Sequence, residues 1–153
     1  MTDAELMGLA LAEARSAGEH GDVPIGAVVA RDGELVAAAG NEREAAGDPT
    51  AHAEILALRR AAAALGSWRL TGCSVYATLE PCPMCAGALV AARVDRVVFA
   101  AFDPKAGACG SLYNLCVDPR LNHELAVDSG VAAGEAAELL RSWFAGRRGP
   151  TPE

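Results

Sequence analysis

The segment SVYATLEPCPMCAGALVAARVDRVVFAA (residues 74–101) decides the fold, because it reads as a strand, a helix and a second strand in succession. Residues 74–79 form a short apolar run, which is typical of a buried strand. Pro83 marks the first turn of a helix that extends to about Ala92, since proline is favoured at that position. A further apolar run over 96–101 predicts another strand. Two strands joined by one helix indicate parallel pairing through a right-handed crossover.

The other elements are predicted from helix caps, turn signals and apolar runs. They are helices over about 2–16, 48–65 and 133–148, a hairpin over 25–30 and 35–40, and an edge strand within 124–130. Asp32-Gly33 supplies the hairpin turn, and Asp48 and Pro49 are predicted as the N-cap and first residue of the second helix. This order predicts an α/β fold, with helices on both faces of a sheet whose later strands are parallel. One domain over residues 1–148 and a short disordered tail over 149–153 are expected.

Length and composition bound the class of protein. The chain has 153 residues, enough for one domain with a core, and 52% of them are hydrophobic. Apolar stretches are interrupted before the roughly 18 residues that a membrane helix needs, so no membrane association is expected. Residues 1–18 lack a basic region and carry acids among the apolar residues, unlike a signal peptide. Five cysteines, an odd count without the spacing of a disulfide framework, favour a reducing cytoplasm.

The charge argues against one class of function. The formal net charge is −7, which disfavours indiscriminate binding to phosphate backbones. Lys105 is the only lysine, and Arg141, Arg147 and Arg148 gather near the C-terminus. On charge alone a nucleic acid is an unexpected partner, so the case for one must come from motifs.

Two cysteines at the start of the predicted helix 83–92 have metal-ligand spacing. Cys82 and Cys85 lie one helical turn apart, and the positive potential of a helix N-terminus favours thiolates. Two such thiolates supply half of a zinc site. Among the histidines, His52 stands out because it also lies in the first turn of a predicted helix. Three protein ligands leave one position open, which is the arrangement of a catalytic rather than a structural zinc.

A carboxylate two residues after His52 completes a predicted reaction centre. Zinc lowers the pKa of a bound water to about 7, so hydroxide becomes available at neutral pH. Glu54 is placed to carry protons near the metal without ligating it. A Cys-x-x-Cys pair alone could also be redox-active, but such a pair normally follows the first strand of its unit and needs no His-x-Glu partner. The specific signal is therefore the combination of HAE (52–54) and PCPMC (81–85).

The combined pattern matches the H-x-E…P-C-x-x-C signature of zinc deaminases. Guanine and cytosine deaminases share this core, so the substrate must be judged from other stretches. Over most of its length the sequence resembles the bacterial tRNA-specific adenosine deaminases, of the cytidine deaminase-like superfamily. The stretches that carry the resemblance are VPIGAVV (23–29), DPTAHAEI (48–55), TLEPCPMCAGAL (78–89), RVVFAAFDPKAGACGSL (96–112), Asn122-His123, and Trp143-Phe144 followed by two arginines.

The resemblance implies a three-layer α/β/α domain with a five-stranded mixed sheet, and a role for each matching residue. His52, Cys82 and Cys85 would hold one Zn²⁺ per subunit, and Glu54 would shuttle protons. The implied substrate contacts are Val23 and Pro24 as pocket walls, Asn41 and Ala53 as hydrogen-bonding groups for a flipped base, Asp103 and Lys105 beside the neighbouring nucleotides, and His123, Phe144, Arg147 and Arg148 on the outer RNA surface.

Several of these positions also have a plain structural interpretation. Asn41 could be a turn residue after a strand, and Asp103 with Pro104 could form an ordinary turn. Arg147 and Arg148 could be a solvated helix end that the helix dipole favours. The remaining cysteines are expected to be free thiols: Cys73, Cys109 and Cys116.

The activity that the resemblance implies is hydrolytic deamination of adenosine to inosine at the wobble position, the first anticodon position, of a tRNA. The family's bacterial substrate is an arginine tRNA. The resemblance also implies binding of the anticodon loop by a cytoplasmic homodimer. Two alternatives stay open: a free nucleobase deaminase such as guanine or cytosine deaminase, and a non-catalytic zinc-stabilised binding module. Glu54 argues against the latter, since a structural zinc site has no use for it.

Overall fold

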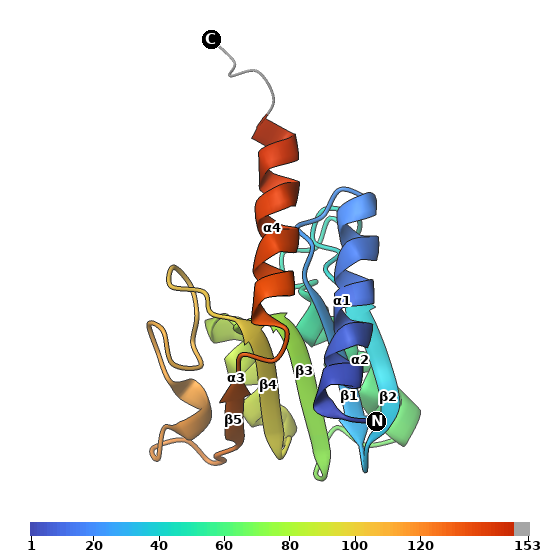
Figure 1. Ribbon diagram of the computed structural model, residues 1–153. Helices are drawn as coiled ribbons and strands as arrows, with labels where there is room; N and C mark the ends of the chain where they lie inside the picture. Colours follow the sequence, from blue (N-terminus) through green and yellow to red (C-terminus); the bar gives the residue numbers. More distant parts are fainter. Residues whose placement is uncertain (149–153) are drawn as a thin grey trace.

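The structure is a computed structural model that describes residues 1–148, except for the side chain of Arg148. The predicted tail over 149–153 lies outside the described residues and stays a prediction. The elements follow one another along the chain as α1 (Asp3–Glu19), β1 (Gly26–Arg31), β2 (Glu34–Gly40), α2 (Ala53–Leu65), β3 (Cys73–Leu79), α3 (Pro83–Ala92), β4 (Arg96–Ala101), the 3₁₀ helix η1 (Leu115–Val117), β5 (Ala126–Ser129) and α4 (Ala133–Arg148) (Figure 1).

A mixed sheet with the strand order β2-β1-β3-β4-β5 forms the middle layer. Strand β1 is antiparallel to both β2 and β3, whereas β3, β4 and β5 are parallel. Helices α1 and α4 cover one face of this sheet, and α2 and α3 cover the other (Figure 1). The prediction of a three-layer α/β/α fold with a five-stranded mixed sheet is confirmed.

The core consists of two apolar layers, one on each face of the sheet. Successive side chains of a strand alternate between the faces. In β1, Val28 therefore packs toward α1, and Val29 packs toward α2. Gly26 at the start of β1 lies directly under α1, where an added Cβ would overlap the carbonyl oxygen of Ala10. This close approach of helix to strand requires glycine.

The start of α2 differs from its prediction, and the difference matters for the site. The helix begins at Ala53 with His52 as its N-cap, so the predicted N-cap role of Asp48 is wrong. The Asp48 carboxylate instead accepts hydrogen bonds from the backbone N–H and the hydroxyl of Thr50, both at 2.8 Å. Because Asp48 forms this local turn, α2 starts later than predicted. His52 and Glu54 therefore lie at the N-terminal start of the helix.

No helix within residues 1–148 has both the length and the apolar character that crossing a membrane requires.

A polar network attaches the start of α1 to the sheet. Arg96 donates hydrogen bonds of 3.0 and 2.8 Å to the Asp3 carboxylate, and its Nε donates to Asp128 at 2.7 Å. The Tyr76 hydroxyl donates to Asp3 at 2.6 Å. The hydrogen bonds from Arg96 and Tyr76 lower the pKa of Asp3 to about 2. Residues from α1, β3, β4 and β5 are thus joined in one cluster.

Asp3→Asn is expected to destabilise the protein in a pH-dependent way. Since folding lowers the pKa of Asp3, its stabilising effect is present above about pH 4 and is lost as the pH falls toward 2. The carboxylate is partly exposed, so the expected loss near neutral pH is about 1 kcal/mol, or roughly 2–4 °C in Tm. Thermal unfolding near neutral pH and near pH 2.5 tests this, with the exposed Glu34→Gln as control. A difference in Tm that stays constant with pH would contradict the prediction.

Candidate metal centre and active-site pocket

Two helix N-termini meet near the C-terminal end of β3. Cys82 is the N-cap of α3, Pro83 is the first helical residue, and the buried Cys85 lies in the first turn. His52 is the N-cap of α2. Each helix start has backbone N–H groups without intrahelical partners and a partial positive charge, which favour anionic groups such as thiolates. The carboxyl ends of the strands are also where open α/β sheets bind their ligands.

The three predicted metal ligands lie together. His52 Nδ1 is 3.6 Å from Cys82 Sγ and 3.5 Å from Cys85 Sγ, and the three ligand atoms all lie within 4.8 Å of one another. For a tetrahedral zinc with bonds of about 2.0–2.1 Å to nitrogen and about 2.3 Å to sulfur, the nitrogen and sulfur atoms are about 3.6 Å apart. The donor types and their spacing therefore fit Zn²⁺, with Nδ1 as the histidine ligand.

The surroundings of the two thiols favour negative charge on Cys82 and disfavour it on Cys85. A hydrogen bond from Cys85 lowers the pKa of Cys82 to about 4, and His52 acts in the same direction. The same contact, together with burial, raises the pKa of Cys85. The contact with Cys82 also raises the pKa of His52. Zinc ligates thiolates and neutral imidazole, so binding of Zn²⁺ would release the protons that Cys85 and His52 hold.

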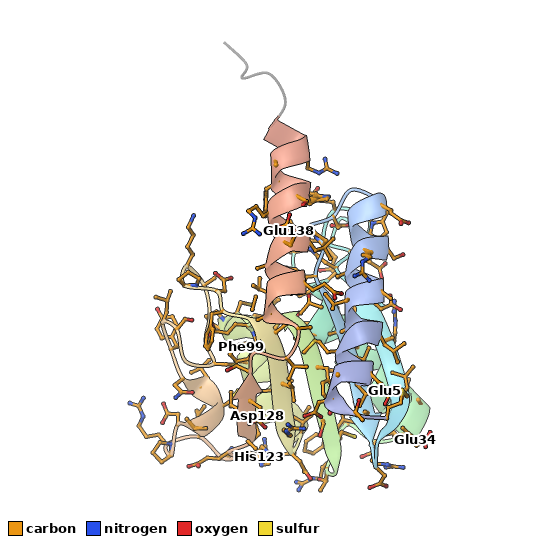
Figure 2. The ribbon with its side chains drawn as sticks, in the orientation of Figure 1. Glu5, Glu34, Phe99, His123, Asp128 and Glu138 are labelled. Carbon is orange, nitrogen blue, oxygen red and sulfur yellow. The ribbon has the colours of Figure 1, made fainter. Side chains whose placement is uncertain are left out.

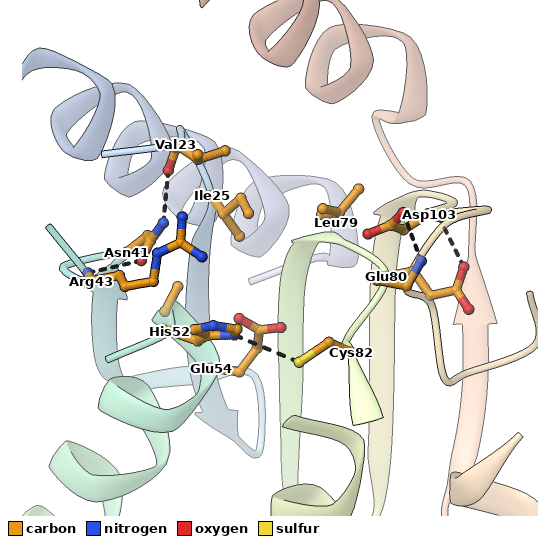
Figure 3. A pocket seen from close by; sticks show the side chains of 12 residues that line it. Val23, Ile25, Asn41, Arg43, His52, Glu54, Leu79, Glu80, Cys82 and Asp103 are labelled. Atoms are coloured by element: carbon orange, nitrogen blue, oxygen red, sulfur yellow. Dashed lines mark hydrogen bonds between the residues drawn. The ribbon is translucent and has the colours of Figure 1, made fainter. Parts of the chain in front are cut away.

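Glu54 lies beside the ligands in the first turn of α2 and is only 4% exposed. Its carboxylate lies between His52 and Cys82 in the view of Figure 3. Burial raises the pKa of Glu54 to about 7, and the charge on Cys82 adds to this effect. A carboxyl group that titrates near neutral pH is suited to accept and return a proton. A structural zinc site would not need such a group.

These residues border a pocket of about 160 Å³. Of the predicted substrate contacts, four line it: Val23, Asn41, Ala53 and Asp103. The buried amide of Asn41 donates to the carbonyl of Val23 at 3.3 Å and accepts from the backbone N–H of Arg43 at 3.1 Å. Asn41 thus organises a turn, and one N–H and one lone pair of its amide stay available to a ligand.

Two predicted contacts point elsewhere. Pro24 is buried against Gly18 of α1, so the wall of the pocket is formed by its neighbours in the chain. Lys105 is exposed, and its backbone N–H donates to the carboxylate of Asp103 at 3.1 Å. Asp103 also accepts from Ala106 at 3.2 Å, so the turn interpretation of this segment describes its backbone correctly.

The residues predicted for the outer RNA surface lie away from the pocket lining. His123 Nε2 is 2.6 Å from the carbonyl oxygen of Val94, which precedes β4, and Figure 2 shows His123 at the lower edge of the molecule. Phe144 on α4 is 45% exposed. The guanidinium of Arg147 lies over the ring of Trp143 at 4.1 Å. The side chain of Arg148 lies outside the described part, so its role stays a prediction.

Five residues that the sequence did not single out also line the pocket: Ile25, Arg43, Leu79, Glu80 and Ala106. Leu79 and Glu80 come at the end of β3, so the rule that ligands bind at the carboxyl ends of strands could have found them. Arg43 had no such signal, because an arginine in a polar loop is usually only solvated. Figure 3 shows its guanidinium beside Asn41 at the pocket.

Family and relatives agree with this geometry. Residues 1–101 match the cytidine and deoxycytidylate deaminase zinc-binding region. The chain is 52% identical over 145 residues to the tRNA-specific adenosine deaminase of Bacillus subtilis strain 168, which covers 94% of this chain and 90% of that protein. It is 49% identical over 142 residues to the tRNA-specific adenosine deaminase of Agrobacterium fabrum strain C58, over 93% of each chain.

Solved structures are similar over nearly the whole chain. One, from studies of A-to-I editing by tRNA:A34 deaminases at the wobble position of transfer RNA, has a TM-score of 0.86 and 49% identity, covering 89% of this chain and 99% of that one. Guanine deaminase from Nitrosomonas europaea has a TM-score of 0.82 at 27% identity, covering 94% of this chain and 85% of that one.

Cys82→Ser is expected to lose the metal and keep the fold, because serine is a good N-cap but a poor zinc ligand. Purified protein should contain zinc well below one atom per chain by elemental analysis, with a far-ultraviolet circular dichroism spectrum like that of the wild type. Cys73→Ala, a buried thiol on β3 outside the site, is the control that should keep its zinc. Full zinc occupancy in Cys82→Ser would contradict the ligand assignment.

Proposed function

The chain belongs to the zinc-dependent cytidine and deoxycytidylate deaminase family, and from this premise we propose that it converts adenosine to inosine at the wobble position of tRNA. The observation that carries the chemistry is Glu54, buried beside the three ligands His52, Cys82 and Cys85. The substrate class rests on the tRNA-specific relatives, which are 52% and 49% identical to this chain over most of its length.

The reaction replaces the exocyclic amine of adenine by oxygen from water and releases ammonia. When bound, zinc supplies Lewis acidity that makes a nucleophile available from water near neutral pH. Glu54 accepts the proton that the attacking water loses and passes it to N1 of the base. As the C6–O bond becomes a carbonyl, Glu54 accepts the second proton of the same water and donates it to the departing amine, so the carboxylate returns to its initial state. The pKa of about 7 suits both directions of transfer.

The base is held by groups that the fold fixes in place. Asn41 has its amide oriented by Val23 and Arg43, and its free hydrogen-bonding capacity serves the edge of the base. Ala53 is the first residue of α2, where the backbone N–H has no partner within the helix. A base must leave its stack to enter this pocket, and this costs least in a loop that is already single-stranded. The anticodon loop is such a substrate.

The cations near the pocket suit a short stretch of RNA despite the net charge of −7. Arg43 is exposed and lines the pocket, and Lys105 is exposed in the loop after β4 that also carries the pocket residue Asp103. Arg147 lies beside Gly21, two residues before the pocket residue Val23. A few local cations can contact the phosphates of one loop, while the acidic remainder disfavours non-specific binding. An arginine tRNA is the substrate that the family resemblance implies.

A homodimer in the cytoplasm completes the proposal. Trp68 is 62% exposed and belongs to an apolar face across α2 and α3 that includes Leu58 and Ala91. Such faces mark sites of protein association. Leu121 and Asn122 border the same region. In a symmetric dimer formed through this face, the segment before His123 would therefore lie in the interface. All five cysteines are free thiols, as a reducing compartment requires.

Glu54→Gln is expected to keep its zinc and to lose deamination by about 10²–10⁴-fold, because the amide cannot carry the proton. Inosine formation under single-turnover conditions and the zinc content of the same sample provide the measurement. Glu19→Gln, an exposed acid at the end of α1, is the control. Near-wild-type turnover by Glu54→Gln would exclude Glu54 as the proton carrier.

The substrate proposal separates cleanly from free nucleobase deamination, which the guanine deaminase fold makes the second candidate. Wild-type protein with total tRNA should form inosine at the first anticodon position, which sequencing detects. Purified arginine tRNA should also react when it is the sole RNA present. Guanine, cytosine and free adenosine should release no more ammonia than they do with Glu54→Gln. Rapid release from a free base without formation of inosine in tRNA would contradict the proposal.

A further inference from the structure

Glu80 is a buried carboxylate for which the proposed reaction has no use. It follows β3, lies two residues before the ligand Cys82, and is only 2% exposed. Its oxygens accept hydrogen bonds from the backbone N–H groups of Asp103 at 3.0 Å, Cys109 at 3.0 Å and Ser111 at 2.9 Å. The Ser111 hydroxyl donates a further hydrogen bond. All of these donors belong to segment 103–111, which follows β4.

The hydrogen bonds divide between the two carboxylate oxygens. Oε1 accepts from the N–H of Asp103 and from the hydroxyl of Ser111, and Oε2 accepts from the N–H groups of Cys109 and Ser111. A carboxylate that is surrounded by donors resembles an anion bound in a nest of backbone N–H groups. Oε1 therefore joins the two ends of the segment, whereas Oε2 holds only the end at residues 109–111.

The segment is shaped to fit this carboxylate. Gly107 lies against it so closely that an added Cβ would overlap the carboxyl group of Glu80. The backbone N–H of Ala108 donates to the carbonyl of Pro81 at 2.8 Å, which joins the segment to the residue before Cys82. The loop that carries a metal ligand and segment 103–111 thus form one hydrogen-bonded unit.

One end of this unit faces the pocket. Asp103, Ala106 and Glu80 itself line the pocket, across from the side formed by Val23 and Asn41. Figure 3 shows Glu80 and Asp103 joined by a dashed line on the opposite side of the pocket from Asn41. If the Asp103 end of the segment moved, the wall that meets the substrate would move with it.

We propose that Glu80 is a positioning residue, whose carboxylate fixes segment 103–111 so that Asp103 and Ala106 form the pocket wall that receives the nucleotide. The role in substrate binding rests on the proposed function. The hydrogen bonds of Glu80 go to segment 103–111 and not to the three predicted metal ligands, so it acts through Asp103. Its removal is therefore expected to weaken substrate binding and leave the metal centre intact.

Glu80→Gln distinguishes the two ends of the segment. The amide NH₂ cannot accept a hydrogen bond, so it must replace the oxygen where its presence costs less. In the place of Oε2, the NH₂ group would meet two backbone N–H donors, those of Cys109 and Ser111. In the place of Oε1, it would meet only one, that of Asp103, since the Ser111 hydroxyl can rotate and accept a hydrogen bond from it. The variant should thus keep its contacts to Cys109 and Ser111 and specifically lose the contact to Asp103.

The test combines amide hydrogen exchange of the zinc-loaded protein with deamination kinetics on tRNA. In Glu80→Gln, exchange of the Asp103 N–H should accelerate by at least about 10-fold, while exchange at Cys109 and Ser111 changes less. KM for tRNA should rise by about 10-fold with a smaller change in kcat, and the zinc content should stay at the wild-type level. Asp95→Asn, whose carboxylate accepts the backbone N–H of Gly72 at 3.0 Å before β4, is the matched control.

Gly107→Ala provides a second variant that leaves Glu80 chemically intact and displaces its carboxylate, and it should reproduce the rise in KM. Unchanged exchange at Asp103, or faster exchange with an unchanged KM in both variants, would overturn the proposal. A fall in Tm alone, with wild-type kinetics per folded molecule, would also overturn it, since that indicates a merely structural carboxylate. Hydrogen exchange needs no RNA, so wild-type protein inactive on tRNA would refute the proposed function separately.

Discussion

The convergence of two helix N-termini on one end of the sheet is the constraint on which the site depends. Helices α2 and α3 lie on the same face, and the first residues of both lie at the pocket. Their combined positive potential favours thiolates at the metal site. Because the two helix starts are close together, the short side chains of His52, Cys82 and Cys85 are long enough to come within metal-ligand distance of one another.

Around this centre, the chain uses buried carboxylates for opposite purposes. Glu54 is surrounded by few donors, so burial raises its pKa toward neutrality. Glu80 accepts four hydrogen bonds and is thereby held as a fixed acceptor. Two acids that line the same pocket therefore differ in what surrounds them: one environment favours proton exchange near neutral pH, and the other favours a permanent hydrogen-bond acceptor.

The sequence predicted the layers and the metal centre well because both depend on local patterns. Apolar runs identified β3 and β4, and the spacing within HAE and PCPMC identified three residues that lie at metal-ligand distance, with Glu54 beside them. Features decided by tertiary contacts escaped prediction. Asp48 has the chemistry of an N-cap but bonds Thr50 instead, and Pro24 faces α1 rather than the pocket. The importance of Glu80 depends on donors from a segment that follows another strand, which no local pattern reveals.

His52 and Glu54 lie two residues apart at the start of a single helix, and this has a mechanical consequence. The offset between the predicted histidine ligand and the proposed proton carrier is fixed by the first turn of one helix. If α2 shifts or tilts when a substrate binds, both side chains move together. Their mutual alignment is thus protected from deformation elsewhere in the chain, whereas their distance to Cys82 and Cys85 depends on how α3 packs beside α2.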